Sequence, residues 1–248
     1  MTKGETLRNT SGSIIDFPEF AIPSSVETPS VCVDQGRMQR NIDGMIERLS
    51  AKGVTCRPHV KSHKSIEIGH RQLTAGANGL TTATIGEAEV FVSSGVKDIF
   101  IAYPLWVSDQ KARRLRALLE NARVAIGLSS VAAAENLSRA LGGSSTLDVL
   151  IEVDSGERRS GVLDAGEALE VGRACERVGL NLTGVFAHAG HSYAGASAVA
   201  GAARDEASAL VTTADALRNA GHRIDRVSAG STPTALLSAV EGVTEERP

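Results

Sequence analysis

Residues 146–154 read TLDVLIEVD, and this stretch decides the fold. Successive side chains of a strand point to opposite faces. One face of this strand therefore carries Leu147, Val149, Ile151 and Val153. The other face carries Leu150 together with Asp148, Glu152 and Asp154. Ionisable groups on a strand face are costly unless that face lines a wet or ligand-filled interior. The stretch therefore predicts a strand of a barrel.

Seven further runs of strand-forming residues accompany this one. In chain order the runs are 30–34, 54–61, 79–85, 98–103, 123–129, 146–154, 182–188 and 224–230. Apolar residues at helical spacing lie between them, in stripes that begin at Met38, Ala112, Ala134, Ala168 and Ala203. Strands that alternate with helices are typical of a parallel sheet. Eight such units in the α/β class favour a TIM-type (β/α)8 barrel over a doubly wound sheet.

Composition narrows the functional classes. The 248 residues are close to the roughly 250 of one barrel domain. With 42% hydrophobic residues, the chain can build a large core and is not a disordered protein. The net charge of −3 and the absence of a Lys/Arg run argue against a general nucleic-acid surface. No apolar stretch approaches the roughly 18 residues of a membrane helix, so no membrane partner is expected.

The domain organisation and the compartment follow from simple features. Residues 1–28 are rich in Pro, Ser and Thr, which predicts an extended N-terminal arm, and residues 29–248 show no linker that would divide them. Cys32, Cys56 and Cys175 are widely spaced beside apolar residues. We interpret all three as reduced, buried thiols. With no signal peptide at the N-terminus, this indicates a cytoplasmic protein.

The first segment that carries chemistry is RPHVKSHK at 57–64. Lys61 shares a strand face with Arg57 and His59, which places it near the strand end and toward the interior. Desolvation and neighbouring cations both lower the pKa of an amine, and a neutral amine can form a Schiff base. A solvated basic loop is an equally good interpretation of these residues. A metal site at His59 and His63 has little support, since no second ligand pair stands nearby.

The second segment is SAGSTPT at 228–234, where a strand ends in small residues. Gly230 allows close approach to the backbone, while Ser231 and Thr232 offer hydroxyl and N–H groups to a phosphate. The alternative is an ordinary helix start with Thr232 as N-cap and Pro233 in the first turn. Both interpretations use the same atoms, so the pattern leaves them open.

Two more polar loops follow confident strands, at 154–161 (DSGERRSG) and 188–193 (HAGHSY). An arginine offers a fixed charge to an anionic oxygen, and a histidine offers a flat ring for stacking or acid–base work. Functional groups of a barrel gather at the carboxyl ends of its strands, so the four loops together predict one site. Walker, GxGxxG and GxSxG patterns are missing after the strands, which removes the usual support for hydride transfer and serine hydrolysis.

At these segments the sequence resembles the fold-type III pyridoxal-phosphate enzymes, whose barrel is of the alanine racemase N-terminal type. It is most similar to the D-threonine aldolase/D-serine dehydratase family. The matching stretches are RPHVKSHK at 57–64, TTATIGEAE at 81–89, DIFIAYPLW at 98–106, VDSGERRSGV at 153–162, HAGHSY at 188–193 and SAGSTPT at 228–234.

The resemblance implies a role for each matching residue. Lys61 is expected to hold pyridoxal 5'-phosphate as a Schiff base, and His188 to pack on the pyridine ring. Arg159 is expected to bond the phenolic oxygen of the cofactor, and Tyr193 to lie near the pyridine nitrogen. The phosphate is expected to be held by Gly230, Ser231 and Thr232.

The resemblance also implies a lyase that acts on small D-3-hydroxy amino acids. An aldolase would cleave Cα–Cβ to give glycine and an aldehyde, whereas a dehydratase would remove the α-proton and expel the hydroxyl. A non-catalytic pyridoxal-phosphate homeostasis protein and an amino-acid racemase are the alternatives.

In relatives the chain continues past Pro248 into the eighth barrel strand and then a β-domain. That β-domain holds the divalent-metal ligands, for Mn or Zn, and part of a homodimer interface, and the strand at 30–34 belongs with it. We therefore expect this barrel to lack its last strand and the β-domain, and we name no metal ligand within the chain.

Overall fold

The computed structural model describes residues 25–27, 29–143 and 147–248. Contacts divide the chain into two units, residues 1–35 and 36–248. Every strand among the described residues belongs to the second unit. The extended arm predicted for residues 1–28 lies outside the described residues except at 25–27.

The strands form one parallel sheet of eight, as the alternating pattern predicted. They are β1 (Thr55–Cys56), β2 (Leu80–Thr82), β3 (Asp98–Ile101), β4 (Arg123–Leu128), β5 (Asp148–Val153), β6 (Asn181–Ala187), β7 (Arg226–Ala229) and β8 (Glu245–Glu246). Their order is β1-β8-β7-β6-β5-β4-β3-β2. A parallel bridge between His59 and Thr81 joins the two ends of this order. The sheet thus curls round on itself, which confirms the TIM-like (β/α)8 fold.

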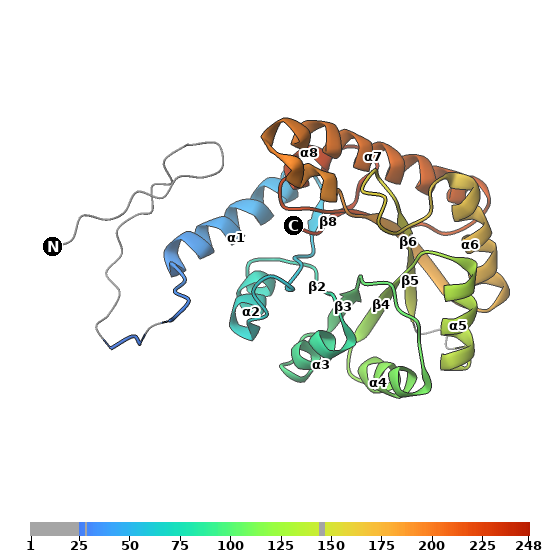
Figure 1. Ribbon diagram of the computed structural model, residues 1–248, viewed down its shortest axis with the longest axis horizontal. Helices are drawn as coiled ribbons and strands as arrows, with labels where there is room; N and C mark the ends of the chain where they lie inside the picture. The colour runs from blue at the N-terminus through green and yellow to red at the C-terminus, as the bar shows by residue number, and fades with distance from the viewer. Residues whose placement is uncertain (1–24, 28, 144–146) are drawn as a thin grey trace. The chain divides into compact units, whose positions relative to one another are not determined.

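The described helices lie outside the curled sheet, and most of them cover its outer face (Figure 1). They are α1 (Gln35–Ser50), α2 (Ile66–Thr74), α3 (Ile85–Ser93), α4 (Asp109–Leu119), α5 (Val131–Leu141), α6 (Ala165–Arg177), α7 (Ala196–Asn219) and α8 (Ala235–Ser238), with a 3-10 turn η1 (Gly190–Ala194). Ser65, Thr84, Ser108, Ser130 and Asp164 cap helices α2 to α6 by accepting a backbone N–H bond. Among the described helices, none has the length and apolar character needed to span a bilayer.

The two faces of β5 separate two apolar clusters. Leu147, Val149, Ile151 and Val153 belong to the large cluster that includes the buried helix residues. Leu150 belongs to a small second cluster with Phe100, Ala125 and Phe186, in which the two phenyl rings meet edge to face at 5.0 Å. The faces predicted for residues 146–154 are confirmed, and the small cluster fills the middle of the barrel.

Paired charges occupy the interior beside the amino ends of the strands. Arg57 is buried and donates to Asp98 Oδ1 at 2.5 Å and to Glu245 Oε2 at 2.7 Å. Burial alone would raise the pKa of Glu245, but Arg57 and Arg226 outweigh it and lower that pKa. Asp148 accepts from Arg123 at 2.6 Å and from Asn181 at 2.6 Å. Asp98, Asp148 and Glu245 are thus compensated by residues of other strands.

Two details of the predicted strand set are wrong. The run at 30–34 is not a strand, and its residues are exposed, because no neighbouring strand pairs with it. Cys32 is consequently exposed, whereas Cys56 and Cys175 are buried as expected. The eighth strand does not lie beyond Pro248, since Glu245–Glu246 fills that place between β1 and β7. The two acidic residues of β8 do not resemble a strand-forming run, and their burial depends on partners that are distant in the sequence.

A matched pair of glycine substitutions tests the interior packing. A Cβ at Gly127 on β4 would lie 2.6 Å from the Phe186 ring, whereas one at Gly201 on α7 meets nothing within 4 Å. We expect Gly127→Ala to lower the free energy of unfolding by about 1–3 kcal/mol through overpacking. Gly201→Ala should raise it by about 0.5–1 kcal/mol through helix propensity. Urea unfolding followed by circular dichroism measures both, and a wild-type midpoint for Gly127→Ala would contradict this packing.

Candidate functional site

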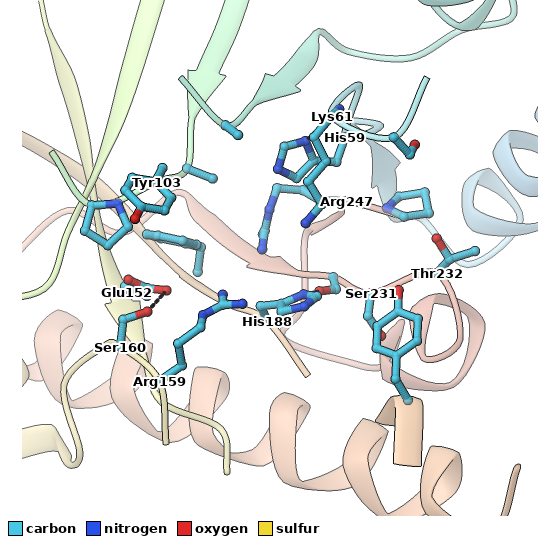
Figure 2. A pocket seen from close by; sticks show the side chains of 18 residues that line it. His59, Lys61, Tyr103, Glu152, Arg159, Ser160, His188, Ser231, Thr232 and Arg247 are labelled. Atoms are coloured by element: carbon cyan, nitrogen blue, oxygen red, sulfur yellow. Dashed lines mark hydrogen bonds between the residues drawn. The ribbon is translucent and has the colours of Figure 1, made fainter. Parts of the chain in front are cut away.

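One cavity lies at the carboxyl ends of the strands, where barrel chemistry is expected. It has a volume of about 510 Å³. Its walls come from the segments that follow β1, β2, β3, β5, β6, β7 and β8. The structure brings together in this cavity all seven residues proposed from the sequence: Lys61, Arg159, His188, Tyr193, Gly230, Ser231 and Thr232. The labelled side chains surround one space (Figure 2).

A tight turn after β1 presents Lys61. The backbone N–H of Lys61 donates to His59 Nδ1 at 3.4 Å, and that of Lys64 donates to Val60 O at 2.8 Å. Lys64 closes the turn with φ +50°, a left-handed conformation that is uncommon outside glycine. Its ammonium group pairs with Glu87 at 2.7 Å. Of the two lysines in RPHVKSHK, Lys61 therefore lines the cavity, and Lys64 is held by a carboxylate beside it.

The surroundings of Lys61 favour its neutral form. Desolvation by the surrounding protein lowers the pKa of Lys61, and the positive charges of Arg159 and Arg247 lower it further. These are the two effects that make a lysine amine nucleophilic.

The surroundings of two histidines in the cavity favour the neutral ring. His188 follows β6 and donates from Nδ1 to Gly230 O at 2.8 Å, which leaves Nε2 as the ring acceptor. Burial lowers the pKa of His188 despite that hydrogen bond. Burial also lowers the pKa of His59 to about 3, with further lowering from Lys61 and Arg247. Tyr193 lies beyond His188, with the two ring centres 6.4 Å apart.

Arg159 is presented by a loop that is closed at its base. Asp154 N–H donates to Val162 O at 2.9 Å, and Val162 N–H donates to Glu152 O at 2.8 Å. A side chain at Gly161 would collide with the Asp154 backbone at 2.6 Å, and Gly161 has φ +111°. Only glycine fits this position, so the spacing between Asp154 and Gly161 is fixed. Arg159 itself is half exposed and contacts Glu157 at 3.4 Å.

The segment after β7 places the small residues against the cavity. The helix predicted to begin there is short: α8 starts only at Ala235, and Thr234 precedes it without a side-chain cap. Thr232 as N-cap is therefore wrong, and a helix of this length adds little dipole to an anion site. Among the described residues, the backbone N–H groups of Ser231 and Thr232 donate to no other group. Both are available to a ligand.

Arg247 and Glu152 are charged cavity residues that were not assigned to the site from the sequence. Arg247 is buried and donates to Ser228 O at 2.7 Å and to Ala187 O, with its guanidinium over the Phe186 ring at 5.3 Å. Glu152 accepts from Ser160 at 2.8 Å and keeps Oε2 without a partner. Burial raises the pKa of Glu152, although Arg159 and Arg247 oppose the effect. The inward parity of Glu152 was a usable signal, whereas Arg247 follows a strand too short to show parity.

No metal-binding cluster accompanies the cavity. Across residues 25–27, 29–143 and 147–248, no group of three or more His, Cys, Asp or Glu side chains is arranged to hold a metal ion. His63 instead accepts the backbone N–H of Ser65 at 3.0 Å through Nδ1.

Comparison with known proteins agrees with the motif pattern. The family model described as "Alanine racemase, N-terminal domain" matches residues 33–248. The chain is 39% identical over 230 residues to a D-threo-3-hydroxyaspartate dehydratase of Delftia sp. (strain HT23). That alignment covers 90% of this chain and 60% of the dehydratase. A D-threonine aldolase of Arthrobacter sp is 32% identical over 225 residues, which cover 89% of this chain and 59% of the aldolase.

A solved structure supports the same relationship. A D-threonine aldolase from Filomicrobium marinum superposes with a TM-score of 0.84 at 29% identity, over 90% of this chain and 62% of that one. The resemblance inferred from the sequence motifs is thereby confirmed. The chain spans about 60% of the length of the dehydratase and aldolase that it matches.

The positive charge of Arg159 offers a test of the cavity electrostatics. Because Arg159 lowers the pKa of Lys61, Arg159→Gln should move the midpoint of Lys61 labelling to higher pH. Labelling with an amine-reactive acetylating reagent over a pH series, read by peptide mass spectrometry, measures the midpoint. Arg158→Gln removes the same charge from the neighbouring position and serves as the control. Equal midpoints in Arg159→Gln and wild type would show that Arg159 does not act on the amine.

Proposed function

Because the chain belongs to the alanine racemase N-terminal domain family, we propose that it binds pyridoxal 5'-phosphate through Lys61 and acts as a lyase on D-3-hydroxy amino acids. One observation carries the proposal: the seven residues suggested by four separate motifs line a single cavity, with the pKa of Lys61 lowered. Relatives that are named as a D-threo-3-hydroxyaspartate dehydratase and a D-threonine aldolase support the reaction class.

The residues present fit this cofactor. A cavity of about 510 Å³ is within the range of small-molecule sites. The lowered pKa of the Lys61 amine suits a Schiff base, and the uncommitted N–H groups of Ser231 and Thr232 suit a phosphate. When bound, pyridoxal phosphate supplies an electron sink for the bonds of the amino acid's α-carbon.

Each cavity residue then has a distinct task. Lys61 would hold the cofactor and, in an elimination, would be the amine that takes the α-proton. Arg159 supplies a fixed positive charge for the phenolic oxygen, and His188 supplies a neutral flat ring for the pyridine face. Tyr193 would lie near the pyridine nitrogen. Gly230 would line the phosphate subsite, and the backbone N–H groups of Ser231 and Thr232 would donate to the phosphate.

A retro-aldol cleavage and an elimination differ in the atom from which the first proton is removed. A retro-aldol cleavage needs a base for the β-hydroxyl proton. His188 is an imidazole available for this in the cavity, whereas the pKa of about 3 makes His59 a weak base. An elimination needs a base at the α-carbon and an acid for the departing hydroxyl. Glu152 has a raised pKa and an unpaired oxygen, which suits it to hold that proton.

The attachment is tested by trapping. Wild-type protein incubated with pyridoxal 5'-phosphate and then borohydride should carry a phosphopyridoxyl group on the peptide that contains Lys61. Lys61→Ala should lose that adduct and the visible absorbance of the Schiff base. Lys64→Ala should keep both, since Lys64 pairs with Glu87 and does not line the cavity. An adduct that persists on the same peptide in Lys61→Ala would refute the assignment.

The reaction is tested by its products. We expect incubation with D-threonine and Mn²⁺ or Zn²⁺ to give glycine if the chain cleaves Cα–Cβ, or 2-oxobutanoate if it eliminates water. Either product should vanish in Lys61→Ala. Chromatographic detection of neither product, with the lysine adduct intact, would replace the lyase with a non-catalytic cofactor-binding protein.

A further inference from the structure

A buried glutamate stands behind the small-residue segment of the cavity. Glu206 belongs to α7 and is fully buried. Its Oε1 accepts the backbone N–H of Gly230 at 2.9 Å, and its Oε2 lies 3.1 Å from the Thr234 hydroxyl. It does not line the cavity, so it cannot contact a ligand there. A carboxyl group without solvent is costly unless it is hydrogen-bonded, and Glu206 bonds to Gly230 and Thr234 of this segment and to the backbone of Ala189.

The same segment is fixed at further points. The Thr234 hydroxyl lies 2.9 Å from Ser231 Oγ, which in turn lies 3.1 Å from Ser192 Oγ on η1. The carbonyl of Gly230 accepts from His188 Nδ1 at 2.8 Å. Gly230 is therefore held on its N–H side by Glu206 and on its C=O side by a residue of the cavity.

This arrangement decides which backbone groups face a ligand. The Gly230 N–H is turned inward to Glu206, while the next two N–H groups, of Ser231 and Thr232, have no partner among the described residues. We propose that Glu206 is the positioning residue of the phosphate subsite, acting through Gly230 and Thr234. The proposal rests on the proposed function, since it assumes that the phosphate of the cofactor sits at this segment.

The charge of Glu206 fits this role. Arg247 and Glu246 are the charged groups that interact with it. Burial raises the pKa of Glu206, although the Gly230 hydrogen bond and Arg247 oppose the effect. The two carboxyl oxygens meet the Gly230 N–H and the Thr234 hydroxyl. Glu206 thus positions the segment by hydrogen bonds rather than by charge.

The experiment compares pyridoxal 5'-phosphate with pyridoxal, which lacks the phosphate. Affinities are measured by spectrophotometric titration of the full chain. We expect Glu206→Ala to weaken pyridoxal 5'-phosphate binding about ten-fold, because the N–H groups of Ser231 and Thr232 are no longer held in place for the phosphate. Pyridoxal binding should be unchanged. Glu206→Gln keeps an acceptor for Gly230 and should retain most of the phosphate preference. Asp215→Ala removes an exposed carboxylate from the same helix and is the control.

Should Glu206→Ala fail to fold, as judged by circular dichroism, Thr234→Val breaks the same link with a side chain of similar shape and should also reduce the phosphate preference. A wild-type preference in a folded Glu206→Ala protein, or an equal loss for both ligands, would overturn the positioning role alone. A full loss in Glu206→Gln would overturn the hydrogen-bond account. Wild-type protein with no preference for the phosphorylated ligand would overturn the proposed function as well.

Discussion

Charged side chains inside this barrel must be paired with opposite charges. The closure of the barrel depends on the ion pairs that Arg57 makes. β1 and β8 are two residues long, so few ladder hydrogen bonds hold them. Arg57 follows β1 directly and binds Asp98 on β3 and Glu245 on β8. One side chain thereby connects the first, third and eighth strands across the interior. Removing one partner of such a buried set leaves an uncompensated charge, at a cost of about 3–5 kcal/mol.

A second buried charge, that of Arg247, lies at the base of the cavity. Arg247 lies over the Phe100 and Phe186 rings at 5.7 and 5.3 Å and donates to carbonyl oxygens of β6 and β7. Carbonyl and aromatic partners leave its net charge in place, unlike the carboxylates that bind Arg57. That charge contributes to the lowered pKa values of Lys61 and His59. The electrostatics that suit Lys61 to Schiff-base chemistry thus come partly from the barrel interior.

Local patterns in the sequence were sufficient for most of the fold. Alternation predicted the two faces of residues 146–154, and helical stripes predicted α1 and α4 to α7, because these signals depend on neighbours in the chain. β8, Arg247 and Glu206 were not foreseen, because their burial is compensated by residues far away in sequence. The strand predicted at 30–34 is not formed for the opposite reason: its local pattern is typical of a strand, but no partner strand lies beside it. Among the site residues, placement in one cavity follows the motifs. The sequence placed Glu152 on the inner face of its strand without assigning it to the site, while Arg247 emerged only from the structure.

The distribution of charge around the cavity favours an anionic ligand. Lys61, Arg159 and Arg247 line the cavity itself. Glu206 and Glu246 are buried behind the backbone of 228–238, where burial raises the pKa of both, for Glu246 to about 8. Glu152 is the acidic residue on the wall, and its pKa is raised as well. Burial thus disfavours the negative charge of these carboxyls, whereas Lys61, Arg159 and Arg247 are cationic side chains of the wall. A ligand with a phosphate therefore meets positive charge in the cavity and hydrogen-bond donors at the segment that Glu206 supports.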